Sequence, residues 1–197
     1  MALQFHPLTV QSCISSPLGN LRLAASPQGL AGLWFDGQRH APDQLQGRQA
    51  WPHCPEHPLL QAAALQLCGY FGGTRTQFAL PLDLGSGTPF QQQVWQALLG
   101  VAHGSTLSYG ALAQRLGRAS AVRAVAAAVG RNPLSLVVPC HRVLGAGGQL
   151  TGYAGGLERK AHLLALESPA PALARPAACS AAGHAQQHLA RAENAPA

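Results

Sequence analysis

The sequence has no long apolar run and no closely spaced pair of cysteines. No stretch of about 18 or more uncharged apolar residues occurs, and no basic segment followed by apolar and then small residues opens the chain. The five cysteines, an odd number without a CxxC pair, argue against both a disulfide framework and a zinc ribbon. These absences predict a cytoplasmic protein that has free thiols and no membrane segment.

Charged residues are also scarce, at 10% of the chain, and they are unevenly distributed. Residues 1–87 carry four basic and four acidic side chains, whereas residues 88–167 carry seven basic and two acidic ones. Such a surplus would attract a polyanion through salt-sensitive phosphate contacts. A solvated surface that only keeps the protein soluble would explain the surplus equally well.

The first half of the chain predicts a small α+β domain over residues 1–86. At 197 residues and 47% hydrophobic content, the chain can hold one large domain or two small ones. Apolar runs at 21–25 and 30–35, separated by turn residues, predict a β-hairpin or small meander. A helix is expected over 57–71, a further strand over 78–82, and a linker at the Gly-Ser-Gly of 85–87.

From residue 88 the apolar spacing becomes helical. Thr88 is the expected N-cap of a helix that starts at Pro89. Short helices are expected over 109–116 and 121–129, with Ser120 as the N-cap of the second. Two such helices joined by a glycine turn are typical of a helix-turn-helix, although most pairs of this size only pack against a core.

The remainder of the second domain, which we place at 87–168, contains three further segments. Residues 134–138 are apolar and predict a strand or extended segment, and residues 145–156 predict a glycine-rich loop. Residues 157–167 return to helical spacing. We expect the Ala- and Pro-rich residues 169–197 to form a disordered tail.

Cys140 follows the apolar segment and stands directly before His141 and Arg142. A cysteine thiol has a pKa of about 8.5, so little thiolate forms at neutral pH unless cations or a hydrogen-bonded base favour it. Cys140 is therefore the candidate nucleophile, with a buried structural thiol as the alternative. The other cysteines lack such neighbours, and we expect structural thiols at Cys13, Cys54, Cys68 and Cys179.

Five motifs around this cysteine carry a family resemblance. They are FQQQVW at 90–95, SYGALA at 108–113, RNP at 131–133, PCHR at 139–142 and TGYAGG at 151–156. In order and spacing they resemble the O6-alkylguanine-DNA alkyltransferases, strongly over 89–167 and more weakly at 16–19. The resemblance implies an α+β fold, in which a ribonuclease H-like sheet-and-helix domain precedes a mostly helical, winged helix-turn-helix-like domain.

The resemblance also implies DNA repair by a single-turnover reaction. An alkyl group would pass irreversibly from O6 of guanine, and less readily from O4 of thymine, to Cys140. His141 would take the thiol proton, directly or through a water, while Glu167 orients the imidazole. Asn132 would hydrogen-bond the backbone of the cysteine turn, and Tyr109 would donate a hydrogen bond or proton to the guanine ring.

A base inside the duplex is inaccessible to such a cysteine, so the resemblance further implies base flipping in double-stranded DNA. Arg123 would fill the vacancy from a helix of small residues in the minor groove. The other expected DNA contacts are Ser120, Ala124, Arg131 and Tyr109, and the expected pocket residues are Pro139, Val143, Tyr153 and Ala154. Taken alone, the residues also allow blander roles: Arg123 on an exposed face, Glu167 as a solvated helix end, and Tyr109 as an ordinary aromatic.

Some departures from the family pattern narrow these expectations. Residues 25–31 offer no Cys or His where some members bind zinc, so we expect no metal and no cofactor. Ala154 stands where some members have a serine, which removes a hydroxyl contact to O6. We expect a monomer without an obligate protein partner. Two rival functions remain open: a damaged-DNA binding module that has no need of Cys140, and a cysteine hydrolase acting on esters or amides.

Overall fold

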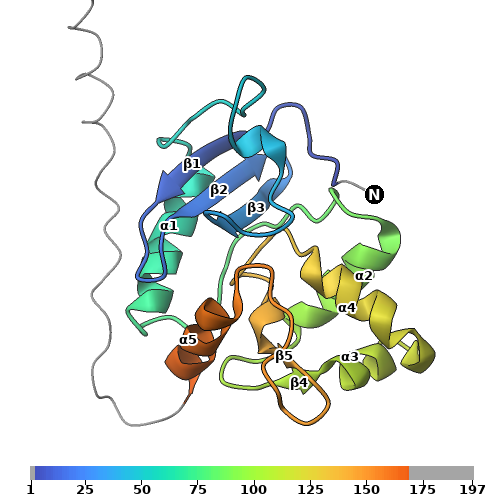
Figure 1. Ribbon diagram of the computed structural model, residues 1–197. Coiled ribbons are helices and arrows are strands. Elements are labelled where there is room, and N and C mark those ends of the chain that lie inside the picture. Colours follow the sequence, from blue (N-terminus) through green and yellow to red (C-terminus); the bar gives the residue numbers. More distant parts are fainter. Residues whose placement is uncertain (1–2, 169–197) are drawn as a thin grey trace, which may run out of the picture.

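The computed structural model describes residues 3–168 (Figure 1). The first half contains the strands β1 (Val10–Ile14), β2 (Leu21–Ser26) and β3 (Gly29–Phe35), followed by the 3-10 helix η1 (Asp43–Leu45) and by α1 (Pro58–Phe71). The second half contains α2 (Pro89–Leu99), β4 (Leu107–Ser108), α3 (Tyr109–Arg115), η2 (Ala119–Ala121), α4 (Val122–Gly130), η3 (Cys140–Arg142), β5 (Val143–Leu144) and α5 (Leu157–Glu167). The α+β class is confirmed. The predicted tail and Cys179 lie outside the described residues.

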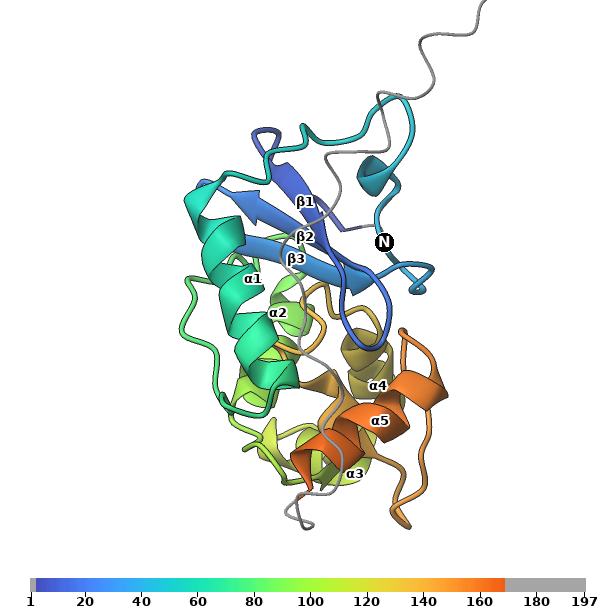
Figure 2. The ribbon, with the colours of Figure 1, turned by 90° about the vertical axis from the view of Figure 1, so that its left-hand side faces the viewer.

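The three strands form an antiparallel sheet in the order β1-β2-β3, with α1 packed across one face (Figure 2). Apolar side chains of β2 and α1, such as Leu23 and Leu67, are fully buried between them. The opposite face is also covered, because the ring of Phe5 packs edge-on against Trp34 and Trp51 at centroid distances of 5.7 and 5.0 Å. Both faces of the sheet are therefore buried.

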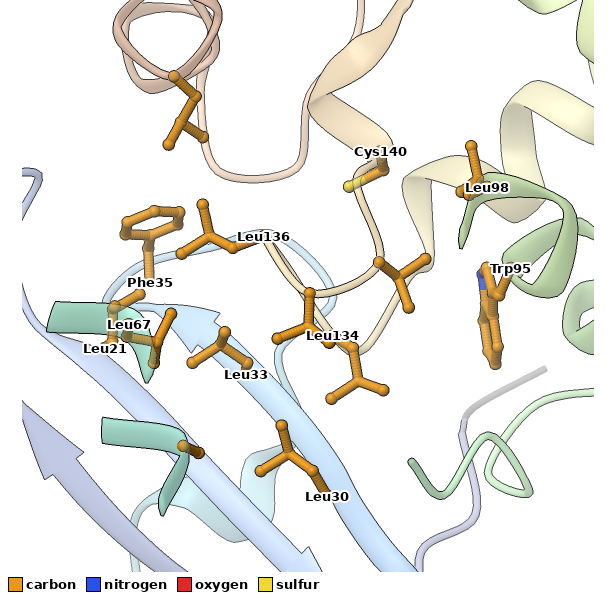
Figure 3. Close-up of a cluster of buried hydrophobic side chains, with 14 of the residues drawn as sticks. Leu21, Leu30, Leu33, Phe35, Leu67, Trp95, Leu98, Leu134, Leu136 and Cys140 are labelled. Atoms are coloured by element: carbon orange, nitrogen blue, oxygen red, sulfur yellow. The ribbon is translucent and has the colours of Figure 1, made fainter. Parts of the chain in front are cut away.

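The edge strand β3 ties the sheet to the segment that leads to Cys140. The amide of Leu33 donates to the carbonyl of Pro133 at 2.8 Å, and the amide of Ser135 donates back to Leu33 at 2.9 Å. Figure 3 shows Leu33, Leu134 and Leu136 in one buried cluster, with Cys140 at the end of the same segment. The two halves of the chain thus share a hydrophobic core.

Two predicted strands are wrong. Residues 134–138 form turns, in which the amide of Val138 donates to the carbonyl of Leu134 at 2.8 Å and Leu136 has a φ of 70°. This run is apolar because it is buried, and apolarity without an alternating pattern does not define a strand. Residues 78–82 make only one isolated bridge, between Leu30 and Leu82, since Pro81 has no amide hydrogen with which to continue a ladder.

The helices of the second half mostly begin where the sequence predicts. The hydroxyl of Thr88 accepts from the amide of Gln91, whose side chain accepts from the amide of Thr88, so α2 starts with a capping box. The predicted cap at Ser120 is wrong: Ser120 lies inside η2, and α4 begins at Val122 without a side-chain cap. None of the helices within 3–168 combines the length and apolarity that crossing a membrane requires.

Candidate active site

Cys140 is the first residue of η3 and is only 4% exposed. Burial raises the pKa of its thiol, while a hydrogen bond from Asn132, the charge of Lys160 and nearby backbone amides lower it. The predicted contribution of Arg142 to thiolate formation is not observed, because that side chain binds Glu167 instead. Burial is the largest of these influences, so the resting side chain is a protonated thiol.

Asn132 fixes the turn that carries the cysteine. Its side-chain amide donates to the Val138 carbonyl at 2.8 Å and lies 3.1 Å from the sulfur of Cys140, while its oxygen accepts from the amide of Leu134 at 3.0 Å. Pro139, also buried, completes the turn immediately before the cysteine. The predicted backbone-ordering geometry of Asn132 is present, together with a direct contact to the thiol.

His141 and Glu167 form a buried pair beside this turn. The Nε2 atom of His141 lies 2.8 Å from Oε1 of Glu167. Burial alone would raise the pKa of Glu167, but the hydrogen bonds and charges of His141 and Arg142 outweigh it and hold that pKa far below its usual range. Since an ionised carboxylate only accepts, Nε2 must carry the hydrogen and Nδ1 the lone pair of the neutral ring.

The Nδ1 atom of His141 is buried and has no hydrogen-bond partner among the described residues. Burial, the largest influence, lowers the pKa of this imidazole, as do the charges of Arg142 and Lys160, although Glu167 opposes them. A neutral imidazole whose unpartnered nitrogen is a proton acceptor is a ready general base.

Arg142 closes the other side of the carboxylate. Its Nε and Nη2 atoms donate to the two oxygens of Glu167 at 2.7 and 2.8 Å, and Nη1 donates to the carbonyl of Val101 at 2.6 Å. Glu167 is 3% exposed, which rules out the solvated helix end that the sequence also allowed. The ion pair is bidentate and desolvated, so it fixes the carboxylate rigidly.

Lys160 is a site residue that is not among those predicted from the sequence. It is fully buried on α5, and its ammonium donates to the carbonyls of Val143 and Thr151, the latter at 2.7 Å. Burial lowers its pKa to about 8, against an opposing influence from Cys140. Lys160 therefore pins the glycine-rich loop next to the cysteine. Its only signal in the sequence is that it is the sole lysine of the chain.

A surface cavity of about 320 Å³ is lined by Tyr109 and by part of the glycine-rich loop, whereas Cys140 and His141 are not among its lining residues. The phenol of Tyr109 donates to the carbonyl of Gly152, another lining residue, at 3.1 Å. Burial together with the nearby Cys140 raises the pKa of both Tyr109 and Tyr153. The lining residues are Arg39, His40, Tyr109, Ala126, Gly130, Thr151, Gly152, Tyr153 and Ala154. The predicted pocket residues Tyr153 and Ala154 thus line the cavity, whereas Pro139 and Val143 do not. The carbonyl of Val143 accepts a hydrogen bond from Lys160.

Arg39 and His40 also line this cavity, although they are not among the predicted site residues; they follow β3 in the sheet-and-helix half. The amide of Arg39 donates to the carbonyl of Ala154 at 3.0 Å and so fastens the two halves at the cavity. Nothing in the local sequence marks these residues, because their position depends on contacts between distant segments.

The predicted DNA-contact residues lie on and around α4. Val125, Ala128 and Val129 are buried against the core, whereas Arg123 and Ala124 are exposed on the opposite side. Ser120 is exposed in η2, and Arg131 lies near His40, whose pKa is lowered by burial and by that charge. The basic surplus at the surface is only one charge smaller than the sequence suggests, because Glu167 is buried together with Arg142 and Lys160.

Three other cysteines lie within the described residues. Among residues 3–168 no disulfide is present, and Cys13, Cys54 and Cys68 are half-buried. Within the same residues, no three His, Cys, Asp or Glu side chains come together as metal ligands.

Both halves of the chain match known proteins of one family. Residues 9–84 match the family model for the 6-O-methylguanine DNA methyltransferase ribonuclease-like domain, and residues 89–169 match the model for the DNA binding domain of the same family. The chain is 48% identical over 154 residues to the methylated-DNA–protein-cysteine methyltransferase of Mycobacterium leprae, covering 78% of this chain and 89% of that protein. It is 47% identical over 160 residues to the protein of the same name from Mycobacterium tuberculosis, covering 81% and 93%.

Solved structures give the same result. The crystal structure of Mycobacterium tuberculosis OGT in complex with DNA superposes with a TM-score of 0.73 and 44% identity, covering 82% of this chain and 96% of that one. The crystal structure of Mycobacterium tuberculosis O6-methylguanine methyltransferase also gives a TM-score of 0.73, at 45% identity, covering 83% and 96%.

Proposed function

The chain belongs to the 6-O-methylguanine DNA methyltransferase family and repairs DNA by alkyl transfer to a cysteine, and on that basis we propose that Cys140 is the acceptor. The observation that carries this proposal is the set of buried groups next to Cys140. Asn132 contacts its sulfur, and the neighbouring His141 is hydrogen-bonded to Glu167 and has an unpartnered Nδ1 atom. Among the described residues, the histidine–carboxylate ion pair is His141–Glu167, and Cys140 directly precedes His141 in the chain.

The proposed reaction begins with proton transfer. Nδ1 of His141 takes the proton of the Cys140 thiol, directly or through a water, and Glu167 stabilises the imidazolium that forms. The thiolate attacks the alkyl carbon, so that a sulfur–carbon bond forms as the carbon–oxygen bond breaks and its electron pair stays on the guanine. The product is a thioether without a leaving group, and each molecule therefore acts once.

Tyr109 is the proposed donor to the departing guanine. Its raised pKa keeps the phenol protonated, so it can donate a hydrogen bond or proton as negative charge develops on the ring. The hydroxyl now donates to Gly152 and must turn toward the base when the cavity is occupied. Backbone amides around Ala154 contact O6 of the guanine in place of a serine hydroxyl. A lesion at O4 of thymine is the poorer substrate.

We propose that the lesion is presented in double-stranded DNA by base flipping. The exposed side of α4 supports this step, since Ala124 leaves room for close approach and Arg123 is long enough to fill the vacated stack. Ser120 and Arg131 flank that surface. A related protein that is 44% identical has been crystallised with DNA, which supports the same partner for this chain.

Intact-mass spectrometry after incubation with an O6-methylguanine duplex tests the acceptor. We expect wild-type protein to gain one methyl group and Cys140→Ala to gain none while still binding DNA. Cys68→Ala serves as the matched control and should still gain one. Methylation of Cys13, Cys54 or Cys68 in its place would overturn the assignment. The same measurement excludes or supports a damaged-DNA binding module, because such a module would gain no mass. A separate assay with a chromogenic ester tests the cysteine hydrolase, which would turn the ester over repeatedly.

We propose in addition that the chain consists of domains 1–86 and 87–168 and acts as a cytoplasmic monomer without an obligate protein partner. A reducing compartment supports the chemistry, because Cys140 must remain an unoxidised thiol until it meets a lesion. Sedimentation of the free protein and of its DNA complex tests the monomer.

A further inference from the structure

Tyr70 connects the sheet-and-helix half of the molecule to the carboxylate of the active site. It lies near the end of α1, and Figures 1 and 2 both place that end of the helix beside α5. The Tyr70 hydroxyl donates to Oε1 of Glu167 at 2.7 Å, and the residue is only 1% exposed. Its ring packs against Phe71, Phe78 and His103, so the hydroxyl is held in place by its surroundings.

Oε1 of Glu167 is shared among three donors. Tyr70 Oη, His141 Nε2 and Arg142 Nη2 lie 2.7, 2.8 and 2.8 Å from it. A carboxylate oxygen has about two lone-pair sites, so each additional donor weakens the hydrogen bond that the others receive. The phenol therefore competes directly with the imidazole for the same negative charge.

We propose that Tyr70 is a positioning residue for alkyl transfer, which acts through Glu167 to fix the His141 ring and to limit its basicity. The inference rests on the proposed function of Cys140 and His141. It gives the ribonuclease-like domain a part in the chemistry, since α1 belongs to that domain and supplies one of the donors to the catalytic carboxylate.

Removal of the Tyr70 hydroxyl should shift the pKa of His141 in one definite direction. With one competing donor removed, Glu167 Oε1 interacts more strongly with His141, and this gain is larger for the protonated imidazole than for the neutral one. The pKa of His141 is therefore raised. Less neutral base is present at a given acidic pH, and the acidic limb of the rate profile moves to higher pH. The other ionisable groups around the pair, which the change leaves in place, are Arg142, Cys140, Lys160, Tyr153 and His103.

The experiment compares single-turnover methyl transfer by wild type and Tyr70→Phe between pH 5 and 9. We expect the acidic limb of Tyr70→Phe to lie higher by roughly half a pH unit to one unit, with the plateau rate retained within about threefold. Phe78→Leu is the matched control, because it loosens the ring packing of Tyr70 without removing the hydroxyl. It should lower thermal stability and leave the limb unshifted.

A double-mutant comparison tests the route through the carboxylate. In a Glu167→Gln background, Tyr70→Phe should cause no further shift, since the two changes act on one interaction. A Tyr70→Phe profile that superposes on wild type overturns the proposal, and so does a lower plateau with an unshifted limb.

A second measurement is independent of methyl transfer. Titration of the His141 ring by NMR should give a higher pKa in Tyr70→Phe than in wild type, and equal values overturn the proposal. If wild-type Cys140 gains no methyl group, the proposed function fails, while this titration still decides the role of Tyr70.

Discussion

The thiol of Cys140 and the carboxylate of Glu167 are both buried, yet their surroundings act on them in opposite directions. The thiol pKa is raised by burial, while that of the carboxyl is depressed because His141 and Arg142 outweigh the effect of burial. The site therefore stores a neutral nucleophile next to a fixed negative charge. Proton transfer to His141 produces an imidazolium between the thiolate and the carboxylate, where both can stabilise it.

Asn132→Ala should impair both the stability and the reactivity of the cysteine turn. The change leaves the Leu134 amide without a partner and leaves the Val138 carbonyl with the Cys140 amide as its remaining donor. It also removes a donor that lowers the thiol pKa. We expect a loss of about 2 kcal/mol in urea unfolding and a shift of iodoacetamide labelling of Cys140 to higher pH. Ser135→Ala, which removes one buried hydroxyl, should leave the labelling midpoint unchanged; an unchanged midpoint in Asn132→Ala would contradict the role.

Acid should destabilise the protein in two steps. The folded pKa of His141 lies below its usual value of about 6.5 and that of Glu167 lies below about 4.3, so in both ranges the unfolded chain binds more protons than the native state. Stability is therefore lost as pH falls through about 6.5 and again below about 4.3. Urea unfolding at a series of pH values checks this. Glu167→Gln should lack much of the second loss, and an unchanged slope would refute the assignment.

The sequence predicts the reactive residues but not the groups that hold them. Cys140, His141 and Asn132 are close in the chain and share recognisable motifs. Tyr70 and Arg39 reach the site only because α1 and the loop after β3 pack onto the second half, and short-range patterns contain no information about such contacts. Lys160 is only one of seven basic side chains in the sequence of the second half, and its burial depends on three backbone carbonyls that only the fold brings together.

At the scale of elements, α4 has the features of both roles that the sequence left open, a helix that packs against the core and a helix that can contact DNA. Val125 and Val129 pack into the core on one side of the helix, and Arg123 and the small residue Ala124 are exposed on the other side. A helix with this composition can be both a packing unit and a groove-binding surface, because alanine satisfies both requirements.

Arg123→Ala should distinguish DNA handling from chemistry. We expect repair of a duplex lesion to fall at least about tenfold, equivalent to ~1.4 kcal/mol, while reaction with free O6-benzylguanine changes little. Arg48→Ala removes the same charge from an exposed position in the first half and is the control. Equal losses on both substrates would count against a role for Arg123 in flipping.

Element boundaries were predictable where local chemistry sets them. The capping box of α2 and the N-cap Ser108 of α3 are encoded by residues within one turn. The turns at 134–138 were not, because that apolar run is buried between β3 and the second half. Its burial reflects tertiary packing, and a local pattern cannot distinguish this from a strand.

At the scale of the whole molecule, polar and apolar contacts join the two halves. The Arg159 side chain lies 4.7 Å from the centroid of the Phe35 ring and donates to the carbonyl of Leu18 at 2.9 Å. Gly155 allows this closeness, since a Cβ there would come within 3.1 Å of Phe35. The links at Leu33 and Tyr70 add to these contacts, so the halves should not unfold independently.

Unfolding should therefore be a single cooperative transition. Trp34 and Trp51 report on the sheet and Trp95 on α2, so Trp95→Phe and the double variant Trp34→Phe/Trp51→Phe separate the fluorescence of the two halves. Within each variant, the urea midpoint from the remaining fluorescence should coincide with the midpoint from circular dichroism of the whole chain. Separate midpoints within one variant would show that the interdomain contacts are too weak to couple the halves.

The burial of Lys160 has a consequence for labelling the protein. As the chain contains no other lysine, the native state exposes no ε-amine, and acylating reagents are left with only the α-amino group. Attachment of a fluorophore or resin through surface amines will therefore select the chain terminus. Acylation at Lys160 will instead mark molecules in which α5 has come away from the glycine-rich loop.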